Sequence, residues 1–211
     1  MIRLILVRHG NTFESNETPT MVGAQSDLPL TAQGRAQATH FAQVLSTDGI
    51  CPKAIYAGSL QRQKQTAEIV RDHLQLASPI SSPEAALTEI DYGAWEGLAQ
   101  EEIIKLWPRE YADWTEASNW PVGLFGGTKE GHLAEIRAWI TRLRKKYAPG
   151  DTVIAVTSNG IIRFFYSLQE NEWSLIVKER QVEKLKVKTG HFCELHLFED
   201  SIQIHRWGIK P

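Results

Sequence analysis

The chain has 211 residues, of which 42% are hydrophobic and 23% charged, and its formal net charge is −2. That length suits one large domain or two small ones, and the balanced charge lacks the basic excess typical of nucleic-acid binding. No apolar run approaches the roughly 18 residues that a membrane span needs, and no leader is visible at the N-terminus. We therefore expect a globular cytoplasmic protein with neither a membrane nor a nucleic-acid partner.

The first predicted element is a buried strand over residues 2–7, followed directly by Arg8 and His9. A continuous apolar run of this kind is typical of a strand that is covered on both faces in a parallel sheet. Gly10 lets the chain turn sharply and lets a ligand approach the backbone. Ligands of open α/β sheets bind beyond the carboxyl ends of strands. Arg8 and His9 are therefore expected at a ligand-binding edge.

Helices and short strands alternate along the rest of the chain. The helices are predicted at about 31–45, 60–74, 129–147 and 160–168. The strands are predicted at 54–57, 78–80, 152–156, 192–198 and 202–207, with the last two forming a hairpin. No repeat or clear linker interrupts this order, so the sequence predicts a single α/β domain over residues 1–211.

The segment 98–131 differs from its surroundings because tryptophan, proline and glycine cluster in it. We predict a helical excursion and a loop placed over the mouth of the sheet as a cap. Trp107, Trp114 and Trp120 are expected to face a substrate, since aromatic side chains often line ligand pockets. The alternative is that these three side chains pack in a small satellite core.

Polar side chains follow the predicted strands at three further places: Ser59 to Arg62, Glu89, and Thr157 to Gly160. Together with Arg8 and His9 they would bring two arginines, a histidine and a carboxylate to one edge of the sheet. Paired guanidiniums match the oxygens of a phosphate. A histidine can attack phosphorus, and a glutamic acid can protonate the departing oxygen.

Five sequence blocks, in order, resemble the histidine phosphatases of the phosphoglycerate mutase-like superfamily. The blocks are Leu-Val-Arg-His-Gly-x-Thr at 6–12, Asp-x-Pro-Leu-Thr-x-x-Gly-x-x-Gln-Ala at 27–38, Arg-x-x-x-Thr-Ala at 62–67, Leu-x-Glu-x-x-x-Gly-x-Trp-Glu-Gly at 87–97, and Gly-x-Ile-Arg at 160–163. Arg-His-Gly alone would be a weak signal, but five blocks in order over nearly the whole chain are a strong one. The resemblance implies a three-layer α/β/α sandwich with a mostly parallel central sheet.

The resemblance also implies roles for individual residues. His9 matches the phosphorylated nucleophile, Arg8 and Arg62 the phosphate clamps, and Glu89 the proton donor. The residues expected to bind the substrate are Thr12, Asn16, Ser158 and Asn159. The implied activity is hydrolysis of a small phosphomonoester through a phosphohistidine, with no metal and no other cofactor.

The family's second histidine is missing from this sequence. In the turn that follows the strand at 152–156, Ser158 stands where that histidine belongs, and Thr128 and Lys129 stand where the family often has Glu and Ser. Losing a charge-assisted hydrogen bond costs roughly 1.5–3 kcal/mol, which slows a reaction about 10–150-fold. We therefore expect an attenuated enzyme. The alternatives are an inactive protein that binds phosphate in a regulatory role and, less favoured, a phosphoglycerate mutase, because residues 98–131 show no evident basic cluster for a second phosphate.

Overall fold

A computed structural model describes all 211 residues and contains one five-stranded sheet in the order β2-β3-β1-β4-β5. The strands are β1 (Ile2–Arg8), β2 (Ala54–Ala57), β3 (Thr152–Thr157), β4 (Phe192–Leu197) and β5 (Ile202–Ile209). β1 and β2 both pair with β3 in parallel, whereas β4 pairs antiparallel with β1 and with β5. Four strands therefore point the same way and only β4 is reversed, which makes the sheet mixed but mostly parallel.

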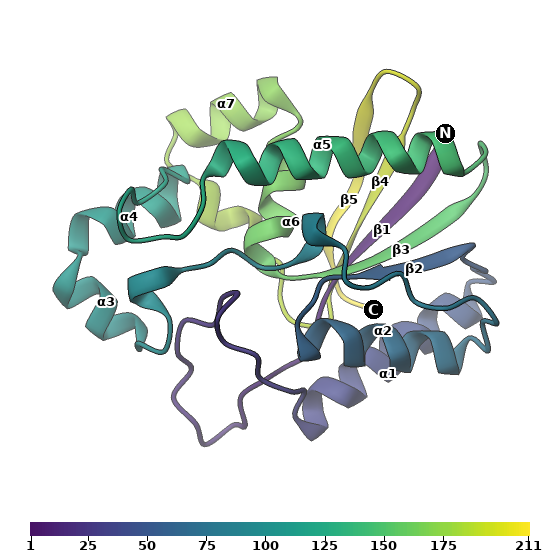
Figure 1. The fold of residues 1–211 in the computed structure, drawn as a ribbon, viewed down its shortest axis with the longest axis horizontal. Helices are drawn as coiled ribbons and strands as arrows, with labels where there is room; N and C mark the ends of the chain where they lie inside the picture. Colours follow the sequence, from purple (N-terminus) through teal and green to yellow (C-terminus); the bar gives the residue numbers. More distant parts are fainter.

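Helices cover both faces of this sheet (Figure 1). The helices are α1 (Ala32–Thr47), α2 (Gln61–His73), α3 (Gln100–Leu106), α4 (Pro108–Ala117), α5 (Lys129–Lys146), α6 (Asn159–Tyr166) and α7 (Glu170–Lys178). α1 and α2 lie on one face, and α5 and α6 lie on the other. The predicted three-layer α/β/α sandwich is confirmed.

The central strand β1 shows why its sequence is apolar from Leu4 to Val7. Leu4 and Leu6 point into the core beneath α5, while Ile5 and Val7 point into the core beneath α1 and α2. All four side chains are fully buried. Because side chains alternate between the faces of a strand, two covered faces require an uninterrupted apolar run.

Side-chain caps fix where the helices begin. The hydroxyl of Thr31 accepts a hydrogen bond from the Gly34 amide at the start of α1, and Thr128 does the same at the start of α5. At α2 the carboxylate of Asp27 accepts from the Gln61 amide at 2.6 Å. The predicted boundaries of these three helices consequently agree with the structure to within about two residues.

The structure differs from the sequence-based expectation at residues 78–80 and between residues 170 and 185. Residues 78–80 form no strand, and only an isolated bridge joins Ser81 to Tyr56 of β2. Helix α7 and the 3-10 turn Val182–Leu185 were not predicted. α7 contains no buried residue, so core packing imposes no strong apolar stripe on its sequence.

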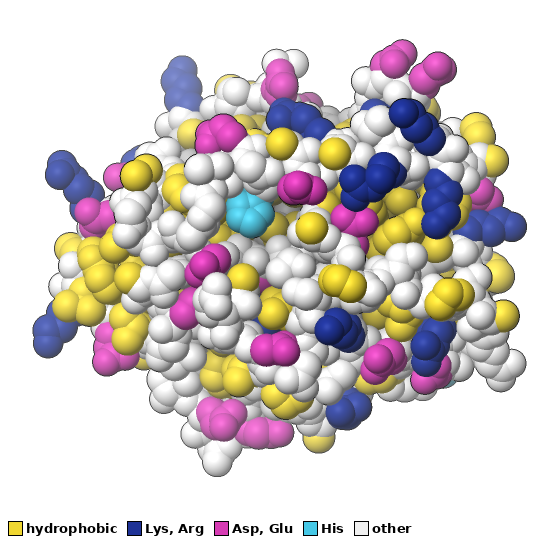
Figure 2. Space-filling model, in the orientation of Figure 1, with side chains coloured by type: hydrophobic (Ala, Val, Ile, Leu, Met, Phe, Trp, Pro, Cys, Tyr) yellow, Lys and Arg dark blue, Asp and Glu magenta, His cyan; other side chains and the backbone are white.

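The segment 98–131 forms α3, α4 and a loop that leads into α5, and it lies at one end of the molecule, left of the sheet in Figure 1. Figure 2 shows apolar side chains gathered at this left edge and acidic and basic side chains interspersed elsewhere on the same face. Ile104 and Leu106 of α3 are exposed. No helix of the chain combines the length and apolar composition that crossing a bilayer requires.

Candidate active site

A cavity of about 1320 Å³ opens at the carboxyl edge of β1 and β3. Arg8, His9, Arg62 and Glu89 all line it, and we call these four residues the histidine end of the cavity. They come from the end of β1, the first turn of α2 and the loop before Ile90. The sheet edge therefore brings together the four residues that the sequence proposed as catalytic.

Two hydrogen bonds fix the orientation and the tautomer of His9. Nδ1 lies 2.8 Å from the carbonyl oxygen of Gly10, which can only accept, so Nδ1 carries the proton. Nε2 is then unprotonated, and its lone pair accepts a hydrogen bond from Arg62 Nε at 3.2 Å. A neutral imidazole with its Nε2 lone pair held beside a cation is suited to attack an anionic phosphoryl group.

Electrostatics keep this imidazole neutral. The His9 side chain is 6% exposed. Burial lowers its pKa well below the usual value, and the charges of Arg62 and Arg8 lower it further. His9 is consequently unprotonated at neutral pH and available as a nucleophile.

The Arg62 guanidinium is held by the loop that follows β1. Nη1 donates to the Ser26 carbonyl at 2.6 Å and Nη2 to the Gly23 carbonyl at 3.1 Å. Each Nη has two hydrogens, so each keeps one free for a ligand. Burial lowers the pKa of Arg62, and the negative charges of Glu89 and other acidic groups oppose this shift. The side chain therefore stays cationic.

Glu96 holds that loop in place. Its carboxylate accepts from the Gln25 amide at 3.1 Å, from the Tyr92 amide at 3.2 Å and from the Ser26 hydroxyl at 2.6 Å. A side chain at Gly23 would collide with the same carboxylate. Glu96 of the Trp-Glu-Gly block therefore fixes the loop at residues 23–26, and the carbonyl groups of that loop orient Arg62.

Glu89 is a buried carboxyl group, 6% exposed. Its oxygens accept from the Ile90 amide at 3.0 Å and from the Gly160 amide at 3.3 Å. Burial raises its pKa, although the Ile90 hydrogen bond and the charge of Arg62 oppose the shift. A carboxyl with a raised pKa facing a cavity can give up a proton at a higher pH than an exposed one.

The predicted substrate-binding residues are placed differently from one another. Thr12 and Asn159 line the cavity, whereas Asn16 is exposed in the loop and does not line it. Ser158 is 1% exposed, and its hydroxyl accepts from Gln63 Nε2 at 3.0 Å inside the protein. The serine that stands in place of the second histidine thus faces a buried glutamine.

Val187 connects Asn159 and Arg8 to a segment far along the chain. The side-chain oxygen of Asn159 accepts from the Val187 amide at 2.9 Å, and Arg8 Nη1 donates to the Val187 carbonyl at 2.7 Å. These bonds hold the residues that flank Val187, Lys186 and Lys188, in the wall of the cavity. The sequence analysis did not consider these two lysines, although their alternation with apolar residues was visible.

Tyr92 and Arg163 also line the cavity and were not proposed as site residues, whereas Trp114, which was expected to face a substrate, lines it as well. Tyr92 and Arg163 lie inside or beside the sequence blocks, so their positions were a usable signal. We call Trp114, Arg163, Lys186 and Lys188 the basic wall. It faces the same cavity as the histidine end.

Only one of the three tryptophans proposed for the cap lines the cavity. Trp114 does so, while Trp107 and Trp120 pack against the larger core. Trp114 makes edge-to-face contacts with Trp120 and Phe125, with ring centroids 5.9 and 5.2 Å apart. The aromatic cluster therefore packs as a satellite core and also presents one indole to the cavity.

A second group of potential metal ligands lies elsewhere. Glu194, His196 and His205 on β4 and β5 place their ligand atoms within 4.8 Å of one another. The Glu194 carboxylate already accepts two hydrogen bonds from Arg3, both at 2.8 Å. This arrangement is a nearly buried ion pair, and a bound cation would have to displace Arg3.

Comparison with known proteins identifies related sequences. Residues 4–210 match the family model of the histidine phosphatase superfamily (branch 1). The chain is 29% identical over 167 residues to phosphoserine phosphatase 1 of Hydrogenobacter thermophilus, covering 79% of this chain and 75% of that protein. It is 33% identical over 156 residues to a probable phosphoglycerate mutase of Proteus mirabilis, covering 74% of this chain and 65% of the mutase.

Solved structures share the fold. A mycobacterial glucosyl-3-phosphoglycerate phosphatase in complex with VO3 superposes with a TM-score of 0.79 at 23% identity, over 98% of each chain. A putative alpha-ribazole-5'-P phosphatase of Escherichia coli gives a TM-score of 0.75 at 20% identity, over 100% of this chain and 98% of the other. At these sequence identities the structural similarity shows that the folds are shared.

Proposed function

We propose that this chain, which belongs to the histidine phosphatase superfamily (branch 1), hydrolyses phosphomonoesters through a phosphohistidine formed on His9. The observation that carries the proposal is the orientation of His9, whose Nε2 lone pair lies beside the Arg62 guanidinium in the cavity. A phosphoryl group bound between Arg8 and Arg62 would meet that lone pair. Small phosphomonoesters are the expected substrates.

The first half of the reaction transfers the phosphoryl group to the enzyme. Nε2 of His9 attacks phosphorus in line as the bond between phosphorus and the ester oxygen breaks. Arg8 and Arg62 neutralise the charge on the phosphoryl oxygens. Glu89 donates its proton to the leaving oxygen, so an alcohol departs rather than an alkoxide.

The second half releases phosphate. The Glu89 carboxylate accepts a proton from a water molecule that attacks the phosphohistidine, and the bond between phosphorus and Nε2 breaks. His9 returns to its neutral form and Glu89 to its acid form. The protons donated and accepted by Glu89 balance over the two steps without a metal ion, so we propose a metal-independent mechanism.

Rapid mixing with p-nitrophenyl phosphate tests the proposal. We expect phosphohistidine to form on His9, detectable by mass spectrometry after quenching, and kcat/KM to fall at least about 10³-fold in His9→Ala. His73→Ala is the matched control, because His73 is an exposed histidine at the end of α2. Full turnover by the His9 variant would rule out the covalent mechanism.

A second candidate function is phosphate binding without turnover. It is supported by Ser158, which is bonded to Gln63 and supplies no cation to a transferring phosphoryl group. The same experiment separates the two functions. A protein that binds inorganic phosphate in calorimetry, yet forms no phosphohistidine and releases no product, would be the binding protein.

A further inference from the structure

Asn159 opens α6 next to the histidine end of the cavity. The strands β1 and β3 end together, because Arg8 pairs with Thr157 and the His9 amide donates to the Thr157 carbonyl at 3.1 Å. Asn159 follows Thr157 by one turn of chain, is half-buried and lines the cavity. It is also the first residue of a helix, where the positive end of the helix dipole favours an anion. The backbone therefore places Asn159 beside His9.

One hydrogen bond fixes the orientation of the Asn159 side-chain amide. Its oxygen accepts from the Val187 amide at 2.9 Å, and a backbone N–H can only donate, so the atom that faces Val187 is Oδ1. Nδ2 lies on the other branch of the side-chain amide. It donates to no group of the protein, and it is not sealed from solvent. Asn159 thus presents two free N–H donors to the cavity that it lines.

The neighbours of Asn159 are the proposed phosphate clamp and the proposed proton donor. The carbonyl group of Val187, the residue that anchors Asn159, accepts from Arg8 Nη1 at 2.7 Å. On the other side, the Gly160 amide donates to the Glu89 carboxylate at 3.3 Å. A phosphoryl group bound to Arg8, with its leaving oxygen at Glu89, would therefore lie against Asn159.

Ser158, which stands where the related phosphatases have a second histidine, does not reach this position. Its hydroxyl accepts from Gln63 Nε2 at 3.0 Å, and Ser158 does not line the cavity. The next residue along the chain, Asn159, is the one whose polar group faces the cavity. A polar side chain at the start of α6 is therefore retained, one residue later than the sequence comparison suggested.

We propose that Asn159 Nδ2 donates a hydrogen bond to an oxygen of the phosphoryl group and so acts in place of the missing second histidine. The catalytic part of this inference rests on the proposed phosphatase function, whereas its binding part requires only that phosphate enters the cavity. A neutral amide supplies a hydrogen bond but no positive charge, which agrees with an attenuated enzyme.

Two variants separate a donor to phosphate from a mere support for Val187. Asn159→Asp keeps an oxygen for the Val187 amide but loses both donors, and Asn159→Ala loses both interactions. We expect kcat/KM for p-nitrophenyl phosphate to fall about 10–150-fold in each variant. The affinity for orthovanadate, which mimics the five-coordinate phosphoryl group, should fall to a similar extent. Wild-type constants in Asn159→Asp, with a loss in Asn159→Ala, would overturn the inference.

Gln33→Glu controls for the charge that Asn159→Asp adds. Gln33 is an exposed amide in the wall of the same cavity, and its side-chain oxygen accepts from Asn11 Nδ2 at 2.9 Å. A carboxylate at this position keeps the acceptor and places a negative charge in the cavity, so both constants should stay close to those of the wild type. An equal loss in the two carboxylate variants, with no loss in Asn159→Ala, would overturn the inference.

Nitrogen-15 NMR observes the donor directly and needs no turnover. The side-chain NH2 signal of Asn159 is the one that is missing from the spectrum of Asn159→Ala. In the wild-type protein we expect one of its two protons to move downfield on saturation with inorganic phosphate, as a proton does when it forms a hydrogen bond. An unchanged signal with phosphate bound would overturn the inference.

These measurements also separate the inference from the proposed function. A phosphate-dependent Asn159 signal without turnover would support the role of Asn159 in binding and reject hydrolysis. Turnover that neither Asn159 variant reduces would retain hydrolysis and reject the role of Asn159. Absence of both phosphate binding and turnover would reject the two proposals together.

Discussion

The histidine end and the basic wall face the same cavity but are built in different ways. At the histidine end, His9 follows β1, Arg62 lies in the first turn of α2 and Glu89 lies in a loop after the 3-10 turn Ala85–Leu87. Backbone groups hold each of these three side chains by hydrogen bonds. The basic wall instead combines α4, α6 and the segment after α7.

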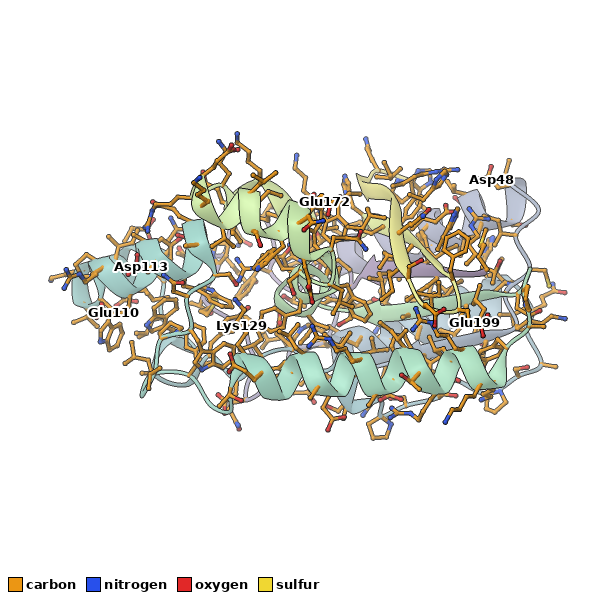
Figure 3. The ribbon with its side chains drawn as sticks, turned by 90° about the horizontal axis from the view of Figure 1, so that it is seen from above. Asp48, Glu110, Asp113, Lys129, Glu172 and Glu199 are labelled. Atoms are coloured by element: carbon orange, nitrogen blue, oxygen red, sulfur yellow. The ribbon has the colours of Figure 1, made fainter.

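Salt bridges from Arg180 to Asp113 and Glu116 join that last segment to α4. Figure 3 shows Asp113 on α4 at the end of the molecule where α7 and Lys129 of α5 also lie. The sheet edge therefore positions the residues of the histidine end, whereas helices and loops packed against one another position the basic wall. The predictions below test that division.

After His9→Ala, the largest effect is expected at Arg62. Arg62→Met removes a positioned cation from the phosphoryl group, and we expect kcat/KM for p-nitrophenyl phosphate to fall about 10²–10³-fold. Arg71→Met on the same helix changes an arginine paired with Asp72 at the surface and should have no effect. Equal activity in all three proteins would mean that phosphate binds elsewhere.

Glu89→Gln should alter the pH profile as well as the rate. The imidazole of His9 acts above its lowered pKa and the Glu89 carboxyl donates below its raised pKa, so the wild-type rate should be bell-shaped in pH. The variant should lose the alkaline limb. With an alkyl phosphate kcat should fall about 10²-fold, and with p-nitrophenyl phosphate, whose leaving group needs no proton, much less.

The same variant has a stability consequence of fixed sign. A carboxyl whose folded pKa is raised favours the folded state below its unfolded pKa, and that contribution disappears as the pH rises through the folded pKa. At neutral pH Glu89 therefore opposes folding, and Glu89→Gln should melt at a higher temperature. A lower Tm for the variant at pH 7 would contradict the buried, raised-pKa description.

Ser158→His should raise turnover only where space is made for the ring, because an imidazolium stabilises a transferring dianion better than a hydroxyl does. Gln63 is fully buried against Ser158, so the larger ring has no room by itself. The double variant Gln63→Ala with Ser158→His should gain about 10-fold in kcat/KM over Gln63→Ala alone. Circular dichroism checks folding, and an unchanged rate in a folded double variant would show that another group already fills this role.

The smallest effect is expected from chelation. The histidine end offers one histidine and one carboxylate, which are too few ligands for a tight metal site held by the protein. EDTA should leave kcat/KM unchanged within error. Loss of activity that added metal restores would reject the metal-independent mechanism.

The sequence by itself was enough to predict the sheet edge and the order of the layers. The apolar run before Arg8 is typical of a strand covered on both faces, and Leu4 and Ile5 do point into opposite cores. The motif blocks also located the cavity-lining positions of Glu89 and Arg62. Local patterns suffice where backbone geometry alone directs the side chain.

Tertiary structure decided where the side chains of the turn after β3 and of the basic wall are placed. Ser158 faces inward because Gln63 donates to it from α2, 95 residues earlier in the chain, and no local pattern encodes that partner. The Arg163 guanidinium stacks on Trp114, which α4 brings to it from far earlier in the chain. Lys186 and Lys188 reach the cavity because Asn159 and Arg8 hold Val187. These placements depend on contacts between distant segments, which form only once the sheet has brought those segments together.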